Sequence, residues 1–285
     1  MSAKRQVLVD RTFRFDLAFI PLVALLVTLI PVGDGFGQSG AYIASPRTAQ
    51  EAIDQVVWAN RILANEGIFD TMGHVTARNP ENLKTFFIAR GNAPETVVKG
   101  DIIEVDMEGT VVTKTKFKPY SEWPIHAGIY KARPDVNAVI HAHPPQTIIM
   151  SVIDMPFLML THLSSFFSEG VPNYDEYDFD SPKTTGMLVQ TKEEGDRVGR
   201  KLGKATGMLM RGHGCNIVGK SIPWAVQAAL VFRDNIVIQM AAQQFGKPKA
   251  LTVEEARKAF KSLRGPEKGW EAWVMRVKKA MPDMN

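Results

Sequence analysis

Two histidines end a short apolar segment, in the sequence VIHAHPP at residues 139–145. The β-branched residues before them predict a strand, and residues two apart on a strand point to the same face. His141 and His143 are therefore expected side by side, while Ala142 points away. Paired imidazoles suit a divalent metal ion, although such a short motif is also found in histidine pairs with a purely structural role.

A third imidazole would complete a three-histidine site with an open position for substrate. His213, in RGHGCNIVG at 211–219, follows the apolar run MLM and is flanked by Gly212 and Gly214. The glycines allow the backbone to bend and a ligand to come close. Three neutral imidazoles bind Zn²⁺ well, and also Mn²⁺, Fe²⁺ or Co²⁺.

An acidic residue opens the next candidate element, in PYSEWPIH at 119–126. Ser121 is expected to cap a helix that Glu122 begins, with His126 one turn later on the same face. A carboxylate beside a divalent ion can act as a ligand or as an acid/base. The alternative is that Glu122 has no catalytic role and only stabilises the helix, because its negative charge lies at the positive end of the helix dipole.

Alternating helix and strand patterns must position these side chains. Apolar spacing and turn residues predict helices at 45–67, 121–133, 145–153, 191–205 and 221–246, with two more in 251–285. Strands are predicted at 73–78, 85–90, 101–112, 135–145, 185–190 and within 207–219, several of them in hairpins. This order predicts an α/β sandwich with a mainly antiparallel sheet.

The first 37 residues read as a secretory signal peptide. A basic start leads into an uncharged run at 17–32, and small residues follow. The run is shorter than the roughly 20 residues of a membrane span. Cleavage is expected after Gly37 or Ala41, giving a periplasmic or secreted protein without stable membrane insertion. An uncleaved N-terminal anchor is the alternative.

Composition excludes some classes of function. The 285 residues carry a mild net charge of +4 with no basic run, so no nucleic-acid partner is expected. The single cysteine, Cys215, rules out an intrachain disulfide and a cysteine zinc finger. The remaining chain is expected to form one domain at 45–250 and a helical extension at 251–285.

The ordered set of SEWPIH, HAHPP and RGHG resembles the class II aldolase/adducin family, over residues 49–244. The resemblance implies that His141, His143 and His213 bind one divalent metal ion, with zinc expected and manganese, magnesium or iron as alternatives. It implies that Glu122 is the catalytic acid/base. It also implies a class II aldolase-like three-layer sandwich, with helices covering a mainly antiparallel central sheet. Assembly as a homotetramer is expected as well.

The chain departs from the phosphosugar members of that family. They carry a G-N-x-S-x-R loop, whereas this chain has GHVTARNP at 73–80, with His74 in the asparagine position. The loop resembles the decarboxylase-type branch instead, so His74, Arg78 and Arg90 are expected to hold a substrate carboxylate. Ser121 is the one small hydroxyl residue kept before the glutamate, and it is assigned to substrate binding.

The resemblance implies a metal-dependent carbon–carbon lyase. Its substrate would be a small unphosphorylated hydroxy, keto or aromatic carboxylic acid, decarboxylated or cleaved as an aldol through a metal-stabilised enolate. One alternative is a sugar-phosphate aldolase, epimerase or dehydratase. The other is a non-catalytic adducin-like interaction domain, in which three histidines and Glu122 would have no reason to stand together.

Overall fold

The computed structural model describes residues 45–177, 179–180 and 186–284. Seven strands of this part form one sheet in the order β3-β2-β1-β4-β7-β6-β5. Every neighbouring pair is antiparallel except β5 and β6. The strands are β1 (His74–Arg78), β2 (Thr85–Ala89), β3 (Ile102–Asp106), β4 (Ala138–Ala142), β5 (Asn173–Tyr174), β6 (Gly207–Met210) and β7 (Gly214–Gly219). The predicted α/β fold with a mainly antiparallel sheet is confirmed.

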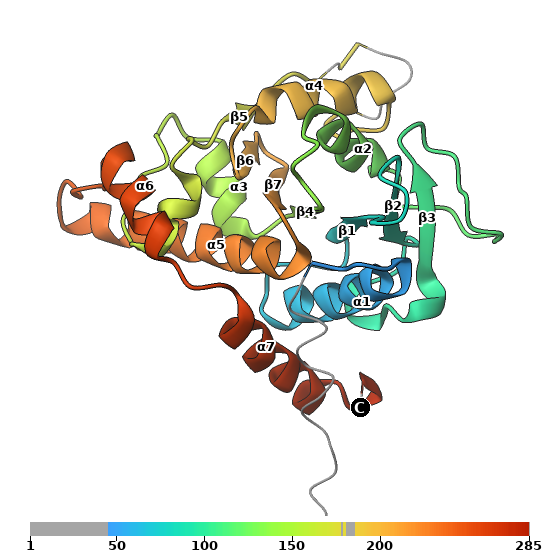
Figure 1. Cartoon of the computed structure of the whole chain (residues 1–285). Helices are drawn as coiled ribbons and strands as arrows, with labels where there is room; N and C mark the ends of the chain where they lie inside the picture. Colours follow the sequence, from blue (N-terminus) through green and yellow to red (C-terminus); the bar gives the residue numbers. More distant parts are fainter. Residues whose placement is uncertain (1–44, 178, 181–185, 285) are drawn as a thin grey trace, which may run out of the picture. The chain divides into compact units, whose positions relative to one another are not determined.

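Helices cover both faces of this sheet (Figure 1). They are α1 (Ala49–Asn65), α2 (Trp123–Ala132), α3 (Pro145–Ser151), α4 (Lys192–Leu202), α5 (Ile222–Phe245), α6 (Val253–Ser262) and α7 (Glu267–Ala280). In Figure 1, α1 and α5 lie along one side of the sheet, and α2 and α4 lie on the other. Strands β1, β2 and β4 are buried along their whole length, and in β1 this burial includes the polar side chains of His74, Thr76 and Arg78.

Helices α2 and α4 pack closely because three glycines line their contact. A side chain at Gly128 would collide with the main chain of Gly195, and one at Gly199 would collide with the carbonyl of Gly128. Glycine is unfavourable inside a helix, so its presence in α4 needs a reason of this kind. The close packing matters for the site because Glu122 stands directly before α2.

The tail helices α6 and α7 form as predicted and pack on the main body. Trp270 of α7 is buried, and Arg61 of α1 pairs with Asp283 just beyond α7 at 2.8 Å. No helix in the described part of the chain is both long and apolar enough to cross a membrane. The predicted signal peptide at 1–37 lies outside the described residues.

Four local predictions are wrong. Residues 186–190 form no strand, and the segment after β3 contributes only a single bridge between Val105 and Val111. The helix predicted at 45–67 begins instead at Ala49, and the side chain of Thr48 caps it by accepting from the Glu51 N–H. Ser121 does not cap α2, because Glu122 occupies the N-cap position and no side-chain hydrogen bond closes that helix end.

Candidate metal centre

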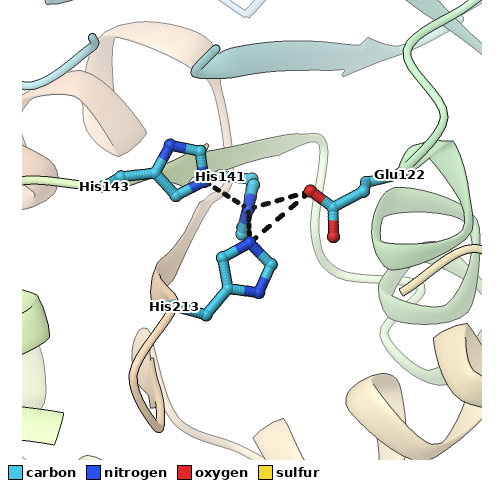
Figure 2. Close-up of side chains that lie close together, drawn as sticks. All are labelled: Glu122, His141, His143 and His213. Atoms are coloured by element: carbon cyan, nitrogen blue, oxygen red, sulfur yellow. Dashed lines mark hydrogen bonds and ion pairs between the residues drawn. The ribbon is translucent and has the colours of Figure 1, made fainter. Parts of the chain in front are cut away.

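Four side chains from three separate parts of the fold converge on one point (Figure 2). Glu122 comes from the start of α2, His141 from β4 and His143 from just beyond it. His213 lies in the turn between β6 and β7. One ligand atom from each residue lies within 4.8 Å of the others. The predicted cluster of three histidines and a glutamate is thus assembled in space.

The spacing of these atoms fits a single small cation. His141 Nε2 lies 3.0 Å from His143 Nε2 and 3.3 Å from His213 Nε2. Glu122 Oε2 lies 3.6 Å from His141 Nε2 and 3.5 Å from His213 Nε2. Ligands roughly 2.1 Å from a tetrahedral zinc ion are about 3.4 Å apart. Three imidazoles and a carboxylate also suit manganese or iron.

Neighbouring groups turn two of the histidines toward this point. His141 Nδ1 hydrogen-bonds Asn216 Oδ1 at 2.8 Å, and the Asn216 amide donates to Met210 Sδ. Nδ1 of His141 therefore carries the proton, which leaves the Nε2 lone pair facing the cluster. Burial lowers the pKa of His141 well below its ordinary value, so the ring is neutral and able to ligate.

Asp70 does the same for His143. Both carboxylate oxygens of Asp70 lie 3.2 Å from His143 Nδ1, and the main-chain N–H groups of Met72 and Gly73 hold that carboxylate. Burial raises the pKa of Asp70, but these N–H groups and His143 outweigh it and leave the pKa below its usual value. A carboxylate behind a ligating histidine is a common way to orient it and raise its basicity.

The two glycines of RGHG act as the sequence predicts. Gly212 has φ +64°, in the left-handed region where glycine is favoured. A side chain on Gly214 would collide with the Ala142 carbonyl and meet the His143 ring at 2.9 Å. Glycine at these positions therefore lets the His213 turn approach the end of β4.

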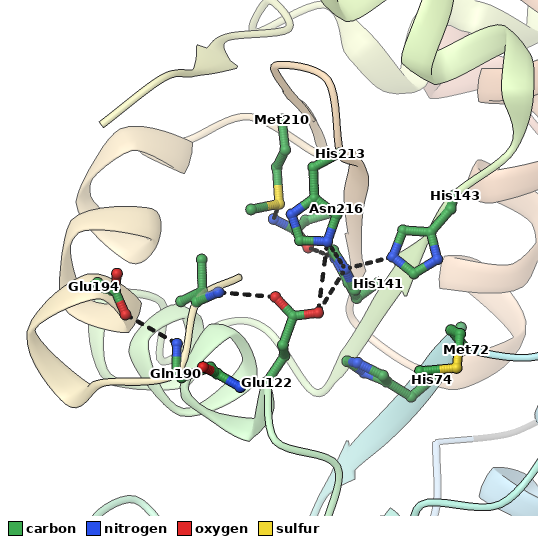
Figure 3. A network of polar contacts seen from close by, with 12 residues as sticks. Met72, His74, Glu122, His141, His143, Gln190, Glu194, Met210, His213 and Asn216 are labelled. Carbon is green, nitrogen blue, oxygen red and sulfur yellow. Dashed lines mark hydrogen bonds and ion pairs between the residues drawn. The ribbon is translucent and has the colours of Figure 1, made fainter. Parts of the chain in front are cut away.

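Glu122 is fixed by a main-chain donor from a distant segment (Figure 3). Its Oε1 accepts from the Val189 N–H at 2.9 Å, which leaves Oε2 facing the histidines. Val189 is held in turn by the start of α4, where Glu194 accepts from the N–H groups of Gln190 and Thr191 at 2.9 Å each. Burial raises the pKa of Glu122, but His213 and the Val189 N–H outweigh it and lower the pKa overall. The carboxyl is therefore ionised at neutral pH.

His74 borders the cluster, as Figure 3 shows. It pairs with His141 in the β1–β4 register, and the ring centroids are 5.1 Å apart. The Tyr120 ring packs against it with centroids 4.6 Å apart. His74 Nδ1 contacts His126 Nε2 at 2.7 Å, and within the described residues its Nε2 has no hydrogen-bond partner. His74 is thus the one predicted substrate residue that the fold brings beside the four donors.

For the other three predicted substrate residues, the structure shows contacts of another kind or an exposed side chain. The buried guanidinium of Arg78 donates to the carbonyls of Val136, Leu83, Tyr130 and Arg133, so it serves the C-terminal end of α2. This use of its donors corrects the expectation that Arg78 holds a substrate. Arg90 pairs with Asp101 at 2.6 Å and covers the Phe117 ring. Ser121 is exposed.

Sequence reasoning missed several groups of the site. Asp70, Asn216 and Val189 act only through contacts between separate elements, and no local pattern marks them. Tyr177 is a fourth: its hydroxyl is buried with no partner in the described part, and its ring centroid lies 6.5 Å from that of His213. The one hint in the sequence was a polar residue, Asn216, in an otherwise apolar predicted strand three residues after His213.

Comparison with known proteins places these features in context. The model of the Class II Aldolase and Adducin N-terminal domain matches residues 54–240. Decarboxylase tropJ of Talaromyces stipitatus is 27% identical over 239 residues, which cover 76% of this chain and 90% of that protein. The 3,4-dihydroxyphthalate decarboxylase of Arthrobacter keyseri is 28% identical over 207 residues, 65% of this chain and 76% of that protein.

A solved structure supports the fold. L-fuculose 1-phosphate aldolase from Glaciozyma antarctica superposes with a TM-score of 0.69 at 24% identity. The match covers 87% of this chain and 98% of that one. At this identity the likeness is evidence for the fold alone.

Proposed function

The chain belongs to the class II aldolase and adducin family, as a lyase with decarboxylase-type relatives, and on that premise we propose its reaction. It is a divalent-metal-dependent carbon–carbon lyase that acts on a small unphosphorylated hydroxy, keto or aromatic carboxylic acid. The observation that carries the proposal is the convergence of Glu122, His141, His143 and His213 within 4.8 Å. Zinc is the proposed ion, with manganese, magnesium or iron as alternatives.

The bound ion would supply a Lewis acid for a substrate oxygen, easing the negative charge that develops when the neighbouring carbon–carbon bond breaks. The residues of the chain would bind the ion and transfer the proton. His141, His143 and His213 would hold the ion, and hydrogen bonds to Asn216 and Asp70 orient the rings of His141 and His143 in advance.

Glu122 is the proposed acid/base. Its ionised carboxylate lies beside the ligating nitrogens and is held by a single main-chain donor. In aldol cleavage it would take the proton of the substrate hydroxyl. In decarboxylation it would deliver a proton, once it has received one, to the carbon that has lost carbon dioxide.

Two observations support an unphosphorylated substrate. His74 stands where phosphate-using members have an asparagine, and it borders the four donors directly. The decarboxylase names of two relatives point the same way.

The test is a substrate screen on purified protein carrying metal. Carbon dioxide release from a panel of hydroxylated aromatic acids is expected, with no turnover of fuculose 1-phosphate or ribulose 5-phosphate. Cleavage or epimerisation of a sugar phosphate without any carbon dioxide release would replace this proposal by the phosphosugar alternative.

A further inference from the structure

A row of buried polar groups runs from the interior of the protein to His74. The Tyr130 hydroxyl lies 2.8 Å from Thr76 Oγ1, which lies 2.8 Å from His126 Nδ1. His126 Nε2 lies 2.7 Å from His74 Nδ1. All four residues are buried, and only the outer nitrogen of His74, Nε2, is left without a partner in the described chain.

The hydrogen bonds along this row can be arranged in only two ways, which differ in the direction of donation. A neutral imidazole has one donor nitrogen and one acceptor nitrogen, so the state of one ring dictates the state of the next. Burial lowers the pKa of His126 to about 3, so that ring is neutral. Either every group donates outward toward His74, or the two histidines donate inward toward Thr76.

The contacts favour the outward direction. The Tyr130 hydroxyl must donate, because a buried hydroxyl proton without an acceptor is costly, and Thr76 Oγ1 is its partner. The Thr76 proton then has two acceptors to choose from: His126 Nδ1 at 2.8 Å and the Val139 carbonyl at 3.5 Å. The second distance is at the limit for a hydrogen bond, so Thr76 donates to His126.

We propose that Tyr130, Thr76 and His126 are positioning residues that hold His74 in the tautomer with its proton on Nε2. His74 thereby presents an N–H donor at the edge of the four-residue cluster, next to His141. The inward direction would present a lone pair there, which would repel a carboxylate or phenolate oxygen. The role of this donor toward a substrate oxygen rests on the proposed function, but the tautomer itself does not.

The tautomer is measurable without substrate. Long-range ¹H–¹⁵N correlation spectra of protein labelled with ¹⁵N-histidine distinguish a protonated Nε2 from a protonated Nδ1. His74→Gln and His126→Gln spectra assign the two rings. We expect both rings to carry the proton on Nε2. A proton on Nδ1 of His74 would overturn the inference, whatever reaction the enzyme catalyses.

Variants of Thr76 test the effect on the site. Thr76→Val keeps the shape but cannot donate, and it should release His74 to the other tautomer while leaving metal content unchanged. With an active substrate from the screen, kcat/KM should fall about 10-fold to 100-fold, the scale of one hydrogen bond to a charged group. Thr76→Ser should restore both the spectrum and the rate.

The spectrum and turnover of Thr76→Val can also contradict the proposal. A Thr76→Val protein that is folded, keeps the His74 proton on Nε2 and keeps full turnover would show that the row does not set the tautomer. Should Thr76→Val fail to fold, Tyr130→Phe offers a second test. It removes the innermost donor of the row, so it should change the populations of the two tautomers in the same spectra.

Discussion

At the residue scale, the convergence of the candidate metal ligands was predictable because each lies in a short local pattern. The H-x-H spacing at the end of a strand and the glycine-flanked histidine in a turn both describe geometry that the local backbone determines. Asp70 and Asn216 were not predictable in this way. Asn216 meets His141 only because β4 and β7 pair with that register, a property of the sheet rather than of either strand.

The ligand assignment predicts a loss of metal in single variants. His141→Ala or His213→Ala should remove most of the bound metal, because each takes away one of three imidazoles from a site whose spacing fits one ion. His162→Ala is the matched control, because His162 is exposed and stands outside the cluster. Elemental analysis of the three proteins makes the comparison, and wild-type metal content in both ligand variants would refute the assignment.

The acid/base assignment predicts a loss of turnover without a loss of metal. Glu122→Gln keeps the size of the side chain and can still accept from the Val189 N–H, but it cannot take a proton. Turnover should fall about 10²–10⁴-fold. Metal content and thermal midpoint should stay near those of the wild type.

Glu108→Gln is the control for a change of charge, since Glu108 is an exposed partner of Lys131 and Lys192. If Glu122→Gln were as active as this control, Glu122 would be only a helix-start residue.

At the scale of elements, most helices and strands follow from apolar spacing and capping residues, but two errors show the limits. The run at 186–190 was taken as a strand because it is apolar, yet Val189 donates its N–H to Glu122 instead of to a ladder. Arg78 was taken as a substrate residue because its loop resembles that of the decarboxylase-type branch and a guanidinium suits a carboxylate. The folded chain gives its donors to the carbonyls at the end of α2. Both outcomes depend on tertiary contacts that no local pattern encodes.

Because α2 packs closely on α4, a substitution in this contact is expected to lower both stability and turnover, although it lies outside the site. Gly199→Ala would place a methyl group against the Gly128 carbonyl and 3.2 Å from Ala132 Cβ. The two helices must separate, so we expect a destabilisation of about 1–3 kcal/mol. Turnover should fall too, because α2 carries Glu122 at its start and α4 holds the Val189 donor through Glu194.

Gly100→Ala is the control, because open space surrounds that position. Denaturant midpoints and turnover of the two variants would be compared. Equal midpoints for Gly199→Ala and Gly100→Ala would mean that the helix contact is not as tight as described.

At the scale of the whole molecule, the signal peptide and the homotetramer stay predictions, as does the division at residue 250. The signal predicts that residues 1–45 fused to a reporter are exported, and that mature protein begins near Gln38 or Tyr42. Fractionation and N-terminal sequencing would decide this. Soluble cytoplasmic protein that still begins at Met1 would contradict it.

The central claim is that the full chain breaks a carbon–carbon bond with a divalent ion held by His141, His143 and His213, beside the acid/base Glu122. The most direct measurement is carbon dioxide release by purified protein before chelation, after chelation and after metal is returned. We expect about one divalent ion per chain, loss of carbon dioxide release on its removal, and recovery when zinc, manganese, magnesium or iron is restored. Undiminished release from protein that elemental analysis shows to be free of metal would contradict it.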